Sequence, residues 1–220
     1  GSRVSFCRKK NHMIFKYIII TRIFNKFDKV NLFAGCKSEA SLLGMSEGHL
    51  ERPITSLIVG GSNKYMGFGE FEARDFSKKI MKMQDSFKGS IVLTTSRRTG
   101  KIGKTISDRL RGDGYKPSLE YFWGAGGDNP YLGILAYSDY LVVSGDSISM
   151  LSEACAAPGG VYIYVAPNFN SKKHKRYHEE LYRLGAARPL EDVFSNWDPY
   201  NFNPTFDMAE EVRKRISFAT

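Results

Sequence analysis

The sequence predicts an α/β fold in which a mostly parallel sheet is covered by helices on both faces. From residue 54 onward, short apolar runs alternate with segments that have helical periodicity. The apolar runs are rich in β-branched residues and contain few polar ones, as in strands that are buried on both sides. Turns rich in Gly and Ser separate the two kinds of segment. These observations indicate a Rossmann-like domain over residues 54–220.

Each element of this domain follows from its local pattern. Strands are expected at the apolar runs 56–59, 90–95, 119–123, 140–143 and 161–165. Helices are expected between and after them, at about 71–86, 104–112, 131–137, 148–157 and 173–184. The first helix has an apolar face formed by Phe76, Ile80, Met83 and Phe87. Residues 189–204 lack a regular pattern, and a last helix is expected near 206–216.

Residues 1–53 differ from the rest of the chain in charge. Residues 1–50 hold nine Lys or Arg and three acidic residues, so they carry +6 of the net charge of +9. The apolar run at 13–24 contains Lys16 and Arg22 and is too short to span a bilayer, so no transmembrane segment is expected. It is predicted to form a strand near 14–20, with an organelle-targeting segment as the alternative. We interpret residues 1–53 as a basic N-terminal extension.

Charge and cysteine content limit the partners and the compartment. Because most of the excess positive charge lies in the extension, nucleic acid is not an expected partner of the domain. A nucleic-acid or membrane contact of the extension itself is the weakest of the functional alternatives. Cys7, Cys36 and Cys155 are scattered along the chain, which suggests a reducing, cytoplasmic compartment and no disulfide framework.

Four segments that follow predicted strands are rich in residues suited to oxyanions. They contain Gly60, Gly61 and Ser62; Ser96, Arg97 and Arg98; Gly126 and Gly127, with Asn129 and Tyr131 beyond them; and Asp146, Ser147 and Ser149. Because the carboxyl ends of parallel strands share one edge of the sheet, we expect these segments to meet there. Ligands of such sheets bind at this edge, at the topological switch point.

The segment 144–149 leads into a helix whose N-terminus offers free N–H groups and a positive dipole end to an anion. Glu153, one turn further along, could accept hydrogen bonds from ribose hydroxyls. The alternative is an ordinary βαβ unit in which Glu153 is merely solvated. Arg97 and Arg98 could clamp a phosphate bidentately, or they could be a surface pair.

Several common sites do not fit the sequence. GKIGKT at 100–105 resembles a P-loop, but Arg98 stands where the first Gly is required, so the spacing is wrong by two residues. No GxGxxG fingerprint follows a strand. His174 and His178 lack an HExxH pattern and an acidic third ligand, so no metal and no tightly bound cofactor are expected. The sequence fixes no pair of acids, and no catalytic residue is identified.

A set of ordered motifs resembles a known family. The motifs are IVGGSNK at 58–64, TTSRRT at 94–99, GDNPYLG at 127–133, AYSD at 136–139, GDSISMLSEA at 145–154, VY at 161–162, YH at 177–178 and ARP at 187–189. Together they are similar to the plant mitochondrial-fission factor family, named for elongated mitochondria, and to its bacterial homologues. The family in turn resembles the C-terminal, nucleotide-binding half of a GT-B glycosyltransferase.

The resemblance implies roles for individual residues. It implies that Gly60, Gly61 and Ser62 approach the donor phosphates, that Ser147 and Ser149 cap the phosphate-facing helix, and that Glu153 holds the ribose. Residues 1–53 are too few for the first GT-B domain, so they are alternatively a truncated remnant of it. PGG at 158–160 replaces the family's usual Gly-Lys-Pro turn.

The predicted function is binding of a nucleoside diphosphate or nucleotide sugar, as part of a glycosyltransferase-like protein. Binding is the stronger prediction, because turnover would need the missing half or a partner. The alternative is a non-enzymatic adaptor of the fission-factor type, which recruits a dynamin-like partner through surface aromatics such as Tyr200 and Phe202. Partners would then be the nucleotide ligand and another protein, or a second copy of the chain. In a eukaryotic source the family implies association with mitochondria.

Overall fold

The computed structural model describes residues 50–64, 66–127, 129–191, 194–195 and 197–199, all of which lie within the unit Cys36–Phe202. In this part of the chain, six strands form one sheet in which every pairing is parallel. The strands are β1 Ile54–Val59, β2 Ser90–Thr95, β3 Leu119–Tyr121, β4 Tyr140–Ser144, β5 Gly160–Tyr164 and β6 Arg188–Pro189. Their order in the sheet is β3-β2-β1-β4-β5-β6, which is the order of a doubly wound nucleotide-binding fold.

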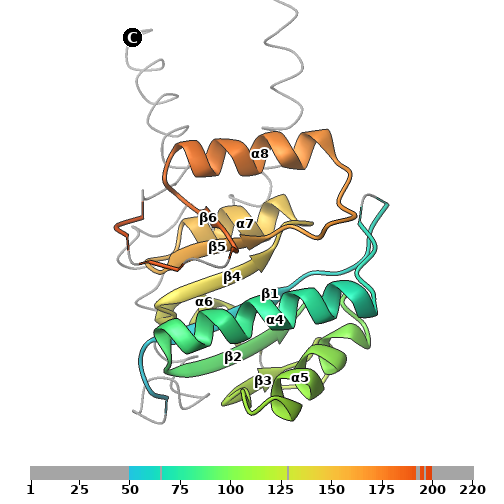
Figure 1. Ribbon diagram of the computed structural model, residues 1–220, viewed down its shortest axis with the longest axis vertical. Coiled ribbons are helices and arrows are strands. Elements are labelled where there is room, and N and C mark those ends of the chain that lie inside the picture. The colour runs from blue at the N-terminus through green and yellow to red at the C-terminus, as the bar shows by residue number, and fades with distance from the viewer. Residues whose placement is uncertain (1–49, 65, 128, 192–193, 196, 200–220) are drawn as a thin grey trace, which may run out of the picture. The chain divides into compact units, whose positions relative to one another are not determined.

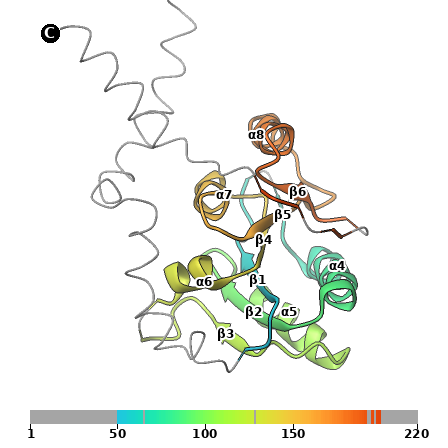
Figure 2. The same cartoon turned by 90° about the vertical axis from the view of Figure 1, so that its left-hand side faces the viewer.

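Five helices connect the strands: α4 Glu70–Phe87, α5 Ile102–Gly112, α6 Tyr131–Tyr137, α7 Ile148–Cys155 and α8 Lys172–Arg183. Helices α4 and α5 cover one face of the sheet, and α6 and α7 cover the other (Figures 1 and 2). Helix α8 contacts β6, and its Tyr177 lies within hydrogen-bond distance of Ser152 on α7. The predicted α/β fold, with a parallel sheet covered on both faces, is confirmed.

The predicted elements between residues 54 and 184 are all present, but two details differ. Strand β3 ends at Tyr121 instead of 123, because the backbone N–H of Trp123 donates to Thr95 Oγ1 (2.9 Å) and leaves the ladder. The short strand β6 was not predicted, since two residues are too few to show a periodic pattern. The strand expected near 14–20 and the helix expected near 206–216 lie outside the described residues.

The core forms where the predicted apolar face of α4 meets the sheet. Phe76, Ile80 and Met83 are fully buried. Phe76 packs edge-on against Tyr164 of β5, with ring centroids 4.9 Å apart. Burying a side chain of this size contributes about 1.5–3 kcal/mol. The packed sheet therefore gives the loops at its carboxyl edge a rigid base.

Candidate functional site

The topological switch point lies between β1 and β4. The chain runs from β1 to β2 and β3 on one side, then crosses back to β4 on the other side of β1. The register pairs Ile58 of β1 with Val143 of β4, so the loops after these strands leave the sheet side by side. The predicted Gly60–Gly61 and Asp146–Ser147 segments therefore meet at this point.

The side chain of Asp146 joins these two loops. Its carboxylate accepts hydrogen bonds from the Gly61 backbone N–H (3.3 Å), the Ser144 hydroxyl (2.6 Å) and the Arg98 guanidinium (2.7 Å). The side chain is fully buried, although that of Arg98 is 39% exposed. Asp146 therefore stabilises the two loops, and its buried carboxylate is not accessible to a ligand.

Gly60 and Gly61, the two glycines predicted to approach phosphates, belong to the same hydrogen-bond network. The Gly60 N–H donates to Ser144 Oγ at 2.6 Å. A Cβ at Gly60 would lie 2.1 Å from Asp146 Oδ1, and one at Gly61 would lie 2.1 Å from the Arg98 carbonyl oxygen. Both positions thus need glycine because neighbouring groups approach so closely. A phosphate at these amides would have to displace their present partners.

The segment after β2 separates the two predicted arginines. A tight turn fixes it, since Thr99 Oγ1 accepts the Ser96 backbone N–H (2.9 Å) and donates to the Val59 carbonyl (2.7 Å). Arg98 is committed to Asp146. The side chain of Arg97 is exposed and lines a pocket described below, so it has access to an anion.

His178 of α8 supports the loop after β4 from behind. Its Nε2 lies 3.0 Å from the Gly145 carbonyl oxygen, and a Cβ at Gly145 would lie 2.8 Å from the His178 ring. Burial lowers the pKa of His178 to about 4, against a smaller raising effect of the bond to Gly145. The ring is therefore neutral near pH 7 and acts as a packed hydrogen-bonding group.

Helix α7 begins at this loop. Ser147 is its N-cap residue, and its side chain accepts the Met150 N–H at 3.5 Å. Ser149 lies in the first turn of the helix rather than at its cap. Leu151, Ala154 and Cys155 are buried and form the apolar face of the helix. This orientation leaves Glu153 on a different face of the helix.

A pocket of about 190 Å³ lies next to the switch point, over the carboxyl ends of β1 and β2. Five predicted residues line it: Ser96, Arg97, Asn129, Tyr131 and Glu153. The other predicted residues are not part of its lining, namely Gly60, Gly61, Ser62, Arg98, Gly126, Gly127, Asp146, Ser147 and Ser149. The structure therefore gathers part of the predicted set around one cavity and uses other members to hold the loops.

Glu153 is the acidic group of this pocket. Its Oε2 accepts a hydrogen bond of 2.7 Å from the Tyr131 hydroxyl. Burial raises the pKa of Glu153, and the bond from Tyr131 partly lowers it. Burial and the charge of Glu153 in turn hold the pKa of Tyr131 well above its ordinary value, so the phenol stays protonated as a donor. The carboxylate is thus held in one orientation at the pocket.

Sequence reasoning missed half of the pocket lining. The additional residues are Ile58, Thr94, Thr95, Trp123 and Met150. Trp123 is 54% exposed, which is unusual for a large hydrophobic side chain among the described residues. Its position at the end of the predicted strand 119–123 was the available signal, because that end lies at the same edge of the sheet as the other predicted loops.

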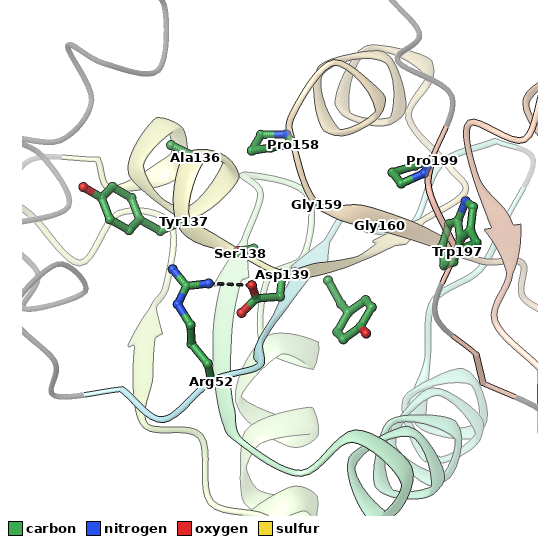
Figure 3. A pocket seen from close by; sticks show the side chains of 11 residues that line it. Arg52, Ala136, Tyr137, Ser138, Asp139, Pro158, Gly159, Gly160, Trp197 and Pro199 are labelled. Carbon is green, nitrogen blue, oxygen red and sulfur yellow. Dashed lines mark hydrogen bonds and ion pairs between the residues drawn. The ribbon is translucent and has the colours of Figure 1, made fainter. Parts of the chain in front are cut away.

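A larger pocket, of about 410 Å³, lies at the opposite edge, by the first residues of β4 and β5 (Figure 3). Its lining includes the ion pair of Arg52 with Asp139. Asp139 also accepts the Ile54 backbone N–H (2.7 Å), so this carboxylate ties the start of β1 to β4. None of the predicted site residues lies here.

The part of the chain that the structure describes offers neither a metal site nor a membrane-spanning helix. There, no group of three His, Cys, Asp or Glu side chains is arranged to hold a metal ion. Within the same residues, no helix is both long enough and apolar enough to cross a membrane.

Comparison with known proteins identifies relatives of the chain. A family model described as mitochondrial fission ELM1 matches residues 25–216. The uncharacterized protein RP120 of Rickettsia prowazekii is 34% identical over 173 residues, which are 78% of this chain and 48% of that protein. The mitochondrial fission protein ELM1 of Arabidopsis thaliana is 27% identical over 189 residues, 84% of this chain and 43% of that protein. The chain thus spans less than half the length of these relatives, and it belongs to the mitochondrial fission ELM1 family.

Proposed function

We propose that the pocket at the carboxyl ends of β1 and β2 binds a nucleoside diphosphate, alone or as a nucleotide sugar. One observation carries the proposal: Glu153 and the exposed Arg97 line the same cavity of about 190 Å³. A ribose presents hydroxyl donors and a diphosphate presents anionic oxygens. A fixed carboxylate and a free guanidinium are the groups that match them.

Each group has a distinct task in this proposal. The Tyr131 hydroxyl occupies one oxygen of Glu153, and the other oxygen accepts from the ribose. Arg97 pairs with the diphosphate, which also lies toward the positive end of the α7 dipole. Because Asp146 and Arg98 neutralise each other at the switch point, the buried carboxylate repels the ligand only weakly.

The proposal is limited to binding. The chain covers 48% and 43% of the two relatives, so glycosyl transfer would involve parts of a longer protein. We propose a glycosyltransferase-like activity only for the longer protein, and a pocket that binds a nucleotide sugar would suit it.

Thermal unfolding with a panel of nucleoside diphosphates and their sugars tests the binding. Ligand at 100 times its Kd stabilises by roughly 2.7 kcal/mol, which raises the Tm of a domain of this size by about 5 °C or more. The rise should shrink by half or more in Glu153→Gln and should also diminish in Arg97→Ala. Glu179→Gln and Arg74→Ala, two exposed positions, serve as controls. No shift with any nucleotide overturns the proposal.

A second function is favoured by the family rather than by the pocket. A family relative is named as a mitochondrial fission protein, and we propose that this chain acts in fission as a non-enzymatic adaptor for a dynamin-like partner. Two large hydrophobic side chains, Phe71 and Trp123, are exposed among the described residues, and exposed aromatics are enriched at interfaces.

Affinity capture with the full chain tests the adaptor role. Recovery of a dynamin-like GTPase from mitochondria-containing cells, reduced by Phe71→Ser and retained by Lys78→Ser, supports it. Capture that repeatedly recovers no such GTPase contradicts it. Because neither Phe71 nor Lys78 lines the nucleotide pocket, this result is independent of the binding test.

A further inference from the structure

We propose that the pocket selects a base with a keto group, uracil or guanine, through the side-chain amide of Asn129, with the base lying against Trp123. This inference rests on the proposed nucleotide binding and names its substrate class. It depends on which hydrogen-bonding atoms of the pocket are already committed to the protein.

The amide of Asn129 offers its NH2 group to a ligand. Its Oδ1 accepts the backbone N–H of Tyr131 at 3.1 Å, at the start of α6. A 180° rotation of the amide would place the NH2 group, instead of Oδ1, against the Tyr131 N–H. The hydrogen bond therefore fixes the orientation of the amide. Nδ2 makes no hydrogen bond to the described residues, and Asn129 belongs to the pocket lining. Its two N–H groups are therefore available to a ligand.

Two other hydroxyl groups of the pocket lining already have hydrogen-bond partners in the protein. Thr95 Oγ1 accepts the Trp123 N–H at 2.9 Å. Ser96 Oγ accepts the Arg98 N–H at 3.3 Å and lies 3.1 Å from Thr99 Oγ1. Of the charged groups, Glu153 and Arg97 are assigned to the ribose and the diphosphate. We assign the edge of the base to Asn129, whose NH2 group has no hydrogen bond to the described residues.

A hydrogen-bond donor distinguishes the bases because they carry either a keto oxygen or an amino group at the same ring position. Guanine carries an acceptor, O6, where adenine carries an amino donor, and uracil carries an acceptor, O4, where cytosine carries an amino donor. An N–H of Asn129 can bond to either keto oxygen, whereas it meets another donor in adenine or cytosine. The pocket therefore discriminates by edge chemistry and accepts both ring sizes.

Trp123 supplies the surface for the ring. Its side chain is 54% exposed and borders the same cavity as Asn129, while its backbone is tied to Thr95. Aromatic side chains stack on any base, with little preference for its identity. Trp123 thus contributes affinity, and Asn129 contributes selectivity.

Calorimetric titration of the full chain with UDP, GDP, CDP and ADP tests the inference. UDP and GDP should bind about tenfold more tightly than CDP and ADP, the effect expected of one hydrogen bond gained or left unmade. Trp123→Ala should weaken all four on the order of tenfold and keep their ratio. Asn129→Asp keeps an acceptor for Tyr131 and replaces the NH2 group by an oxygen, so the keto preference should vanish or reverse.

Asn170→Asp is the matched control, because Asn170 is exposed and does not border the pocket. It adds the same charge and should keep the keto preference. Equal affinity for all four nucleotides, tighter binding of ADP or CDP, or a keto preference that survives Asn129→Asp overturns the inference and leaves nucleotide binding intact. No binding of any of the four overturns the proposed function together with the inference.

Discussion

The Tyr131 hydroxyl donates to Glu153 Oε2 at 2.7 Å and so links the first residue of α6 to the middle of α7. The two helices lie on the same face of the sheet (Figure 2), and the pair borders the pocket beyond the carboxyl ends of β1 and β2. Burial raises the pKa of the carboxyl group, so the ionised form is held at some expense to stability. Such an expense is typical of side chains that serve a ligand.

Glu153→Gln should keep or raise stability while it weakens ligand binding. The folded-state pKa of Glu153 lies above its ordinary value of 4.5, so its contribution is most favourable below pH 4.5 and is lost as the pH rises through the folded pKa. Gln keeps an acceptor for Tyr131 and carries no charge. At pH 8 the Tm of Glu153→Gln should equal or exceed that of the wild type. A clear fall in Tm, absent in Glu179→Gln, would contradict this account.

Asp146→Asn should be strongly destabilising. The substitution puts an NH2 group or a neutral oxygen among the Gly61 N–H, the Ser144 hydroxyl and the Arg98 guanidinium. Because Arg98 is 39% exposed, the main cost is that of buried donors left with a poorer acceptor, about 1–3 kcal/mol. Urea denaturation measures the loss, with the exposed Asp108→Asn as control. Equal unfolding midpoints for the two variants would show that Asp146 does not brace the loops.

Gly60→Ala and Gly112→Ala should have opposite effects. A Cβ at Gly60 would meet Asp146 Oδ1 at 2.1 Å, whereas a Cβ at Gly112 would meet nothing within 4 Å. Gly112 ends helix α5, so Ala there should be neutral or should stabilise by up to about 1 kcal/mol. Gly60→Ala should lower the free energy of unfolding by about 2 kcal/mol or more. Similar unfolding curves for both variants would argue against the close approach of the β1 and β4 loops.

His178 should make the fold sensitive to acid. Its folded-state pKa of about 4 lies below the ordinary 6.5, so between these values the unfolded chain binds a proton that the folded chain does not. The free energy of unfolding therefore has its full value above pH 6.5 and decreases as the pH falls toward 4. At 1.36 kcal/mol per pKa unit, the decrease is about 3 kcal/mol. His178→Gln should show a shallower loss of stability over this range in urea titrations. Identical pH slopes would contradict the prediction.

The fold could be predicted from the sequence because its signals are local and repeated. Phe76, Ile80 and Met83 recur at helical spacing, and each strand is an apolar run that ends at a polar turn. Strand β6 has no such pattern, because its two residues pair with β5 only once the chain has folded. Trp123 lies outside the strand because its backbone N–H donates to Thr95 Oγ1, a bond that no periodicity reveals.

The site was predictable as a set of loops and not as a set of contacts. Parallel topology requires that Gly60, Arg97 and Asp146 reach the same edge of the sheet. Which of them turns inward depends on distances that spacing does not encode. The Asp146 carboxylate is hydrogen-bonded to Gly61, Ser144 and Arg98. Arg97, next to Arg98 in the chain, is exposed.

Direct titration of the full chain with UDP, GDP, CDP and ADP tests the central claim, that the Glu153 pocket binds a nucleoside diphosphate. The wild type and Glu179→Gln should bind the same nucleotide with equal Kd, and Glu153→Gln should bind it about tenfold more weakly or worse. No binding by the wild type, or equal Kd for Glu153→Gln, would contradict the claim.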